Sequence, residues 1–176
     1  MANSEYLTAR FTPHGEYIAA ALSLTLDARL DEVWTALTAP SHLAQWLAPG
    51  VIELRVGGRA HLAFADSGIV IDSAVTAIEP MALLQYSWSG PGEPVRPICW
   101  ALEAIGPRTR LELTLTLPAG EDVERGTAGW AAHLEMLAAT LAGAAMRFPI
   151  PSFRSARAAY GDQLAALSIQ PPAAAA

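Results

Sequence analysis

The hydrophobic residues of this chain change their spacing near residue 120, and that change limits the fold more than any other feature. Within residues 108–117, every second residue from position 111 onward is a leucine: Leu111, Leu113, Leu115 and Leu117. Such alternation predicts a strand with one buried face. Within residues 122–145 the large apolar residues follow helical spacing instead: Trp130, Leu134, Leu137 and Leu141. The order predicts a sheet whose last strand leads into a long amphipathic helix.

Earlier parts of the chain show further strand signals, with turn residues between several of them. These segments are residues 17–26, 51–56, 59–65, 69–78, 83–89 and 98–103. Gly57-Gly58 predicts a tight two-residue hairpin link between the second and third strands, because glycine tolerates positive φ. Two short helices, one carrying Trp34 and one starting at Pro40, interrupt the series between its first and second strands.

A seven-stranded antiparallel sheet with one wet face needs a cover on the other face. The segment 122–145 is long enough, because ~20 helical residues span ~30 Å. A weaker helical segment follows at 153–167. We therefore expect an α+β fold in which a curved antiparallel sheet holds a long C-terminal helix and encloses an interior.

Domain organisation follows from the same pass along the chain. Residues 1–16 have little periodicity and are interpreted as an N-terminal arm that can add to the first strand. Residues 17–168 are expected to form a single domain, and the alanine-rich tail at 169–176 is expected to be disordered.

Composition excludes several classes of function. The net charge is −6 and the basic residues are scattered, which argues against a nucleic-acid partner. All 11 basic residues are arginine, so no lysine can form a Schiff base or serve a phosphate-binding loop. The single cysteine, Cys99, excludes an internal disulfide and a multi-cysteine zinc site. We expect no metal and no cofactor.

Location is predicted from the absence of two signals. No stretch approaches the ~20 uninterrupted apolar residues of a membrane-spanning helix. Residues 1–17 lack the basic start and apolar run of a signal peptide. The sequence therefore predicts a cytoplasmic protein that does not enter the membrane.

Several large side chains are expected to face the interior between sheet and helix. The candidates for a cavity wall are Trp46, Phe64, Tyr86, Trp88, Trp100, Trp130, His133, Leu134 and Leu137. As a group they suit an aromatic-lined small-molecule site. The alternative for each one is ordinary core packing.

Two of these candidates carry polar groups. His133 lies three residues after Trp130 and hence at the edge of the inward helix face, where it can bind a ligand or transfer a proton. Its alternative is a hydrogen-bonded or solvent-edge histidine. Tyr86 can offer its hydroxyl to a ligand or to a neighbouring carbonyl. No motif for a nucleophile, a zinc protease or a dinucleotide is found, and no catalytic residue is assigned.

The ordered set of motifs resembles a known family, the START-like or SRPBCC superfamily with its helix-grip fold. The likeness spans about residues 17–167 and is carried by Asp31 to Thr38 with Pro40 to Trp46, Val56 to Arg59, Thr109 to Thr114, Gly129 to Leu137, and Ala156 to Leu164. The chain is most similar to the branch named after the C-terminal domain of heat-shock-protein ATPase activators. The resemblance implies a cavity for lipids, polyketides or other hydrophobic molecules, and no shared catalytic residues.

Three functions are therefore weighed. The first is binding of a hydrophobic small molecule, such as a lipid, a polyketide or an aromatic metabolite. The second is a cyclase or aromatase that uses polar groups in the cavity, with His133 or Tyr86 assisting proton transfer. The third is a protein-interaction module that regulates a chaperone. A homodimer is compatible with all three.

Overall fold

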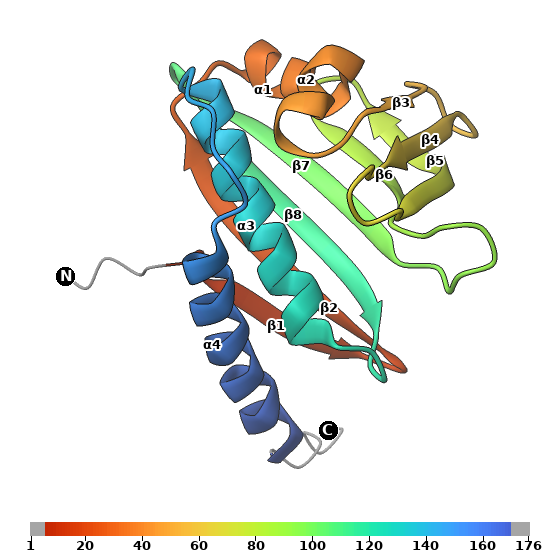
Figure 1. Ribbon diagram of the computed structural model, residues 1–176, viewed down its shortest axis with the longest axis vertical. Helices are drawn as coiled ribbons and strands as arrows, with labels where there is room; N and C mark the ends of the chain where they lie inside the picture. Colours follow the sequence, from red (N-terminus) through yellow and green to blue (C-terminus); the bar gives the residue numbers. More distant parts are fainter. Residues whose placement is uncertain (1–5, 170–176) are drawn as a thin grey trace, which may run out of the picture.

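The computed structural model describes residues 6–169 of the chain, which form eight strands and four helices (Figure 1). The strands are β1 (Ala9–His14), β2 (Tyr17–Leu26), β3 (Gly50–Ile52), β4 (Arg59–Ala63), β5 (Val70–Glu79), β6 (Leu83–Ser87), β7 (Pro97–Ile105) and β8 (Arg108–Pro118). The helices are α1 (Leu30–Thr38), α2 (Pro40–Trp46), α3 (Val123–Leu141) and α4 (Ile150–Ile169). Within residues 6–169, no helix is both long and apolar enough to cross a membrane.

All strands join one antiparallel sheet in the order β1-β2-β8-β7-β6-β5-β4-β3. The expected α+β fold with a curved sheet and a long C-terminal helix is confirmed, but the sheet has eight strands instead of seven. The extra strand, β1, comes from the segment interpreted as an arm, and it pairs with β2 from Ala9↔Leu22 to His14↔Tyr17. Ala9 and Phe11 are its buried residues, so its alternation is too short to stand out in the sequence.

The link between β3 and β4 differs from the predicted two-residue hairpin. β3 ends at Ile52, which pairs with Ala60, and the intervening turn begins with Glu53. The Glu53 amide donates to the Arg59 carbonyl at 2.9 Å, and a Cβ at Gly58 would lie 2.4 Å from the Glu53 carbonyl oxygen. The chain therefore folds back tightly over residues 53–58, and Gly58 is required by close backbone approach rather than by a hairpin turn.

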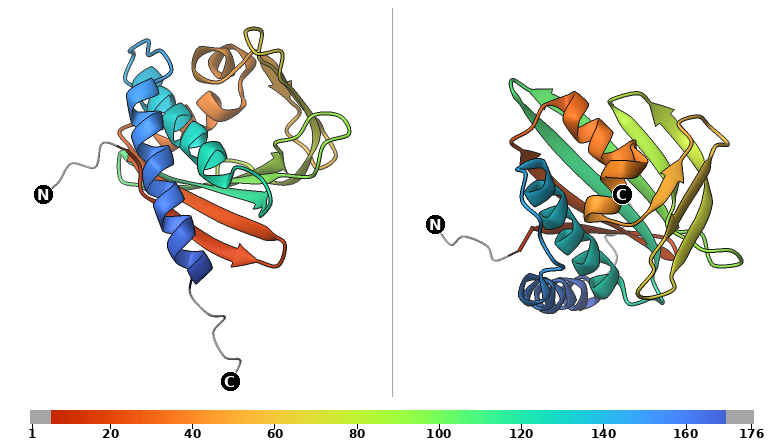
Figure 2. Two further views of the ribbon diagram at one scale, coloured as in Figure 1. Left: turned by 60° about the horizontal axis from the view of Figure 1, so that its bottom comes forward. Right: turned by 45° about the horizontal axis from the view of Figure 1, so that its top comes forward.

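The leucine alternation of β8 places one row of side chains on the concave face of the sheet. Leu111, Leu113, Leu115 and Leu117 are all buried, and the residues between them are not. The helix α3 crosses in front of this face (Figure 1), with Trp130, Leu134 and Leu137 buried beneath it. The two short helices α1 and α2 close one end of the interior, as the right-hand view of Figure 2 shows.

The last helix is longer than the predicted segment 153–167 and packs beside α3 (Figure 2, left). Its Tyr160 is fully buried, contacts Tyr6 and Phe11 edge to face, and donates its hydroxyl proton to the Leu7 carbonyl. These contacts attach α4 to the segment around β1. The tail predicted at 169–176 lies outside the described residues except for Ile169, the last residue of α4.

Candidate functional site

A series of aromatic rings runs from the centre of the core to the surface beside α3. Trp46 and Trp100 pack edge to face with ring centroids 6.1 Å apart, and Trp100 contacts Trp130 at 5.4 Å. Trp130 meets Trp88 at 4.6 Å, and Trp88 meets Phe64 at 5.9 Å. Each such aromatic pair stabilises the fold by about 0.5–1.5 kcal/mol beyond the free energy gained from burying the ring surface. Each ring is therefore positioned by the one behind it.

The outer rings border a groove of about 610 Å³, called the aromatic groove below. Its walls come from the β4–β5 turn, the β6–β7 loop, the first half of α3 and the segment leading into α4. Its aromatic lining residues are Phe64, Trp88, Trp130, Phe148 and Phe153. Small-molecule sites typically have volumes of about 300–1,000 Å³ and mainly apolar walls, so the groove suits a ligand of that size.

One face of α3 forms the longest wall of the aromatic groove. This wall contains Gly126 and Gly129 as well as Trp130 and His133. A Cβ at Gly129 would meet no atom within 4 Å, and one at Gly126 would lie 3.3 Å from Leu117 Cδ1. Glycine inside a helix costs about 1 kcal/mol relative to alanine. These glycines weaken α3, and the groove is more open at Gly129 because no side chain fills the space there.

The wall opposite α3 is attached to it by an ion pair. Arg96, in the β6–β7 loop, donates from Nε and Nη2 to the two carboxylate oxygens of Glu121, at 2.8 and 2.9 Å. The Trp88 amide donates to the Arg96 carbonyl at 2.7 Å, so the same loop places Trp88. A two-point arginine–carboxylate pair fixes direction as well as distance. The pair therefore sets the width of the groove at the start of α3.

The start of α3 is fixed by Asp122. Its Oδ1 accepts the Arg125 amide at 3.1 Å as an N-cap, and its Oδ2 accepts from Arg157 of α4 at 2.7 Å. Asp122 and Arg125 both line the aromatic groove. Within residues 6–169 the guanidinium group of Arg125 forms no hydrogen bond or ion pair. It is therefore a cation available at the groove entrance.

His133 supplies a polar group two turns further along α3. Its Nδ1 lies 3.3 Å from the Trp46 carbonyl oxygen, and burial lowers the pKa of the imidazole. A carbonyl can only accept, so Nδ1 carries the proton and Nε2 is the acceptor in the neutral ring. No buried side-chain nitrogen or oxygen in residues 6–169 lacks a hydrogen bond. Nε2 of His133 has no hydrogen-bond partner, so it is not one of the buried atoms and is accessible to solvent.

The structure brings four of the nine predicted cavity residues together at the aromatic groove: Phe64, Trp88, Trp130 and His133. The other five lie in the packed core behind it: Trp46, Tyr86, Trp100, Leu134 and Leu137. The Trp46 indole donates to the Ala36 carbonyl at 2.9 Å. The Tyr86 hydroxyl bonds to the side chain of Trp100, and burial raises the pKa of this tyrosine.

Sequence reasoning missed several groove residues. Phe148 and Phe153 come from the segment around the start of α4, and Phe148 packs on His133 with centroids 5.5 Å apart. Arg125, Gly126 and Gly129 lie on α3 itself. The two glycines within the helical stripe were the available signal, because a helix seldom places glycine twice on one face without a packing or functional reason.

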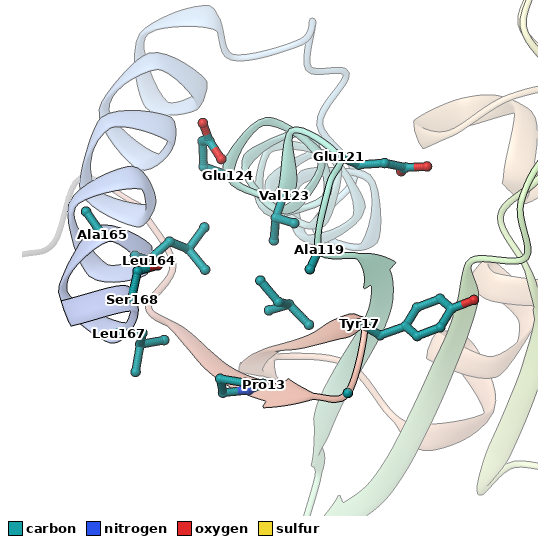
Figure 3. Close-up of a pocket in the computed structure, with 12 residues that line it drawn as sticks. Pro13, Tyr17, Ala119, Glu121, Val123, Glu124, Leu164, Ala165, Leu167 and Ser168 are labelled. Carbon is teal, nitrogen blue, oxygen red and sulfur yellow. The ribbon is translucent and has the colours of Figure 1, made fainter. Parts of the chain in front are cut away.

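A second hollow, of about 550 Å³, lies between the β1–β2 hairpin, the start of α3 and the last turns of α4 (Figure 3). Ile18, Val123 and Leu164 form much of its apolar lining, and Glu124 stands at its rim. The two hollows have similar volumes, so volume does not choose between them. Of the two, the aromatic groove combines edge-to-face rings with a histidine acceptor. Within residues 6–169, no group of three His, Cys, Asp or Glu side chains is placed to hold a metal ion.

A curved antiparallel sheet, two short helices after an early strand and a long helix across the concave face define the helix-grip class of START-like proteins. The chain belongs to the family described as activator of Hsp90 ATPase homolog 1-like protein, whose match covers residues 27–142. This match includes β3 to β8 and all of α3. No curated protein is significantly similar to the chain in sequence.

Solved structures share the fold along most of the chain. A conserved protein of unknown function from Enterococcus faecalis, EF2215, is 22% identical, with a TM-score of 0.77 over 91% of this chain and 92% of that one. CalU16 from Micromonospora echinospora is 25% identical, with a TM-score of 0.71 over 96% and 98%. DynU16, from the dynemicin biosynthetic locus, is 28% identical, with a TM-score of 0.66 over 77% of this chain and 51% of that one.

Proposed function

We propose that the aromatic groove binds a hydrophobic small molecule that has a flat aromatic part. The observation that carries this proposal is the pairing of a helix wall left bare at Gly129 with aromatic rings packed edge to face, around a space of about 610 Å³. Gly129 lets a flat molecule lie against α3, and Trp88 and Phe64 offer ring faces and edges.

Binding is favoured over catalysis by the placement of the two polar candidates. Tyr86 is buried behind the groove, with its hydroxyl bonded to Trp100. Of these two candidates, His133 borders the groove and Tyr86 does not. A cyclase-type reaction needs several polar groups to converge on its substrate, so this placement favours binding. The similarity to a protein of a biosynthetic locus adds support for a small metabolite as the ligand.

Filling the helix wall tests the proposal. Gly129→Leu places a side chain in open space within the groove, and leucine favours the helix more than glycine does. We expect 2-naphthol to raise the unfolding temperature of the natural chain and to have at least tenfold lower affinity for the variant, measured by titration calorimetry. Ligand binding to the folded state alone stabilises it by about 2.7 kcal/mol at 100 times Kd.

A matched control comes from α4. Gly161 is also a helical glycine, and a Cβ there would meet only Glu124 Cγ, at 3.9 Å. Gly161 does not line the aromatic groove, so Gly161→Leu should leave the affinity for 2-naphthol unchanged. If Gly129→Leu binds as tightly as the natural chain, or both variants lose binding equally, the groove is not the site.

A further inference from the structure

The charged and histidine side chains that line the aromatic groove are Glu121, Asp122, Arg125 and His133, and the last two indicate the class of its ligand. The groove's own lining residues include His133 towards the interior and Arg125 at the entrance. The inference rests on the function proposed above and specifies which molecules the groove should prefer.

The inner group is a hydrogen-bond acceptor. The Nδ1 proton of His133 is directed to the Trp46 carbonyl, 3.3 Å away, which leaves Nε2 with its lone pair. Phe64, Trp130 and Phe148 surround the imidazole, with centroid distances of 6.3, 5.9 and 5.5 Å. Within residues 6–169 no side chain donates a hydrogen bond to Nε2, so a ligand hydroxyl that reaches it replaces only water.

The entrance group is a positive charge without a local partner. The two acidic residues that line the groove beside it are engaged elsewhere: Glu121 binds Arg96 through both oxygens, and Asp122 binds Arg157. A third, Glu124, is next to Arg125 in the chain but lines the second hollow instead of the groove. Arg96 also binds Glu93, whose carboxylate accepts the Gly90 amide and does not line the groove. Arg125 therefore remains to pair with an anionic ligand group, and a guanidinium group suits a planar carboxylate in particular.

The spacing of the two groups sets the length of the ligand. Arg125 and His133 are eight residues apart on one helix, which corresponds to ~12 Å along the axis at ~1.5 Å per residue. The flexible arginine side chain can shorten this distance. Between them lie the bare backbone at Gly129 and the indole of Trp130. We propose that the groove selects an aromatic hydroxy acid of two or three fused rings, with its hydroxyl on His133 Nε2 and its anionic group on Arg125.

Three related probes separate the two contacts: 6-hydroxy-2-naphthoate, 2-naphthoate and 2-naphthol. Titration calorimetry of the full chain at pH 7.5 should show the tightest binding for the hydroxy acid. The acid should improve affinity by about tenfold, the size expected for a hydrogen bond to a charged group, and the hydroxyl by about fivefold, the size expected for a hydrogen bond between neutral groups. Sodium acetate of equal ionic strength serves as the carboxylate without rings.

Two variants assign the contacts to residues. Arg125→Gln should lower the affinity for both naphthoates about tenfold and leave 2-naphthol unchanged. Arg108→Gln is the charge-matched control, since Arg108 begins β8 at the end of the strand away from the start of α3, ~30 Å along a strand of 11 residues. His133→Phe keeps an aromatic ring, and it should remove the preference for 6-hydroxy-2-naphthoate over 2-naphthoate.

The comparison of the three probes uses only the natural chain, so it does not depend on whether any variant folds. If 2-naphthol binds as tightly as both acids, or Arg108→Gln weakens the acids as much as Arg125→Gln, the ligand class is wrong while groove binding stands. If none of the three probes binds, groove binding itself is contradicted and this inference falls with it.

Discussion

The Nδ1 atom of His133 lies 3.3 Å from the carbonyl oxygen of Trp46, a residue 87 positions earlier in the chain. The contact joins the middle of α3 to the end of α2 and fixes the imidazole at the wall of the aromatic groove. Burial of the imidazole makes the stability of the fold depend on pH, because burial disfavours the charged ring and lowers its pKa.

The sign of that dependence follows from the lowered pKa of His133. The unfolded chain binds a proton near the ordinary value of about 6.5, and the folded chain binds it only at lower pH. His133 therefore costs no stability above about pH 6.5 and lowers it increasingly as pH falls below that value. In urea unfolding at pH 7.5 and 5.5, the natural chain should lose more stability than His133→Gln. His14→Gln, at the exposed end of β1, should behave like the natural chain.

Gly129 should show opposite effects on stability and on binding. Gly129→Ala adds a Cβ in open space and should raise the free energy of unfolding by about 1 kcal/mol, because alanine favours the helix. The same methyl group stands in the aromatic groove and should weaken binding of 2-naphthol. Gly161→Ala should bring the gain in stability without the loss of affinity. If Gly129→Ala increased both the free energy of unfolding and the affinity for 2-naphthol, the bare helix wall would have no role in binding.

Gly50 is expected to tolerate no side chain. A Cβ there would lie 2.1 Å from the His61 carbonyl oxygen and 2.8 Å from Leu62 Cα, both backbone atoms of β4. Gly50→Ala must push β3 away from β4, at a cost of about 1–3 kcal/mol or more. Gly120→Ala is the control, since its Cβ would meet nothing within 4 Å. Equal unfolding temperatures for the two variants would show that β3 does not pack against β4 as described.

Glu135 should destabilise the fold at neutral pH. Burial between α3 and α4 raises the pKa of its carboxyl group, which accepts a hydrogen bond from Ser152. A carboxyl with a raised folded pKa contributes stability at low pH that is lost as pH rises through its ordinary value and then its folded value. Glu135→Gln should therefore be more stable than the natural chain at pH 7, with the difference disappearing near pH 4. The substitution of an exposed residue, Glu79→Gln, should show no such pH-dependent difference in stability.

The sequence is most informative where the pattern is long. The leucines of β8 and the stripe led by Trp130 predict one strand and one helix well, because burial on one side enforces their spacing. β1 was not predicted as a strand of its own, because only Ala9 and Phe11 of its six residues are buried. Its place comes from pairing with β2 and from Tyr160 of α4, which no local pattern contains.

The candidate site was less predictable than the fold. Inward orientation does not distinguish a ring that lines a groove from one that packs behind it, so Trp88 and Trp100 look alike in the sequence. The distinction depends on Gly129, which leaves open space on α3, and on Phe148, which comes from the segment before α4. Space created by missing side chains is a property of the assembled fold.

The tryptophan indole signals offer the most direct test that the aromatic groove binds a ligand. The chain has five tryptophans, of which Trp88 and Trp130 line the groove while Trp34 lies on α1. In nitrogen–proton correlation spectra, saturating 2-naphthol should shift the indole signals of Trp88 and Trp130 strongly and leave Trp34 in place. Unchanged signals for Trp88 and Trp130 at saturation, or a larger shift at Trp34, would contradict binding at the groove.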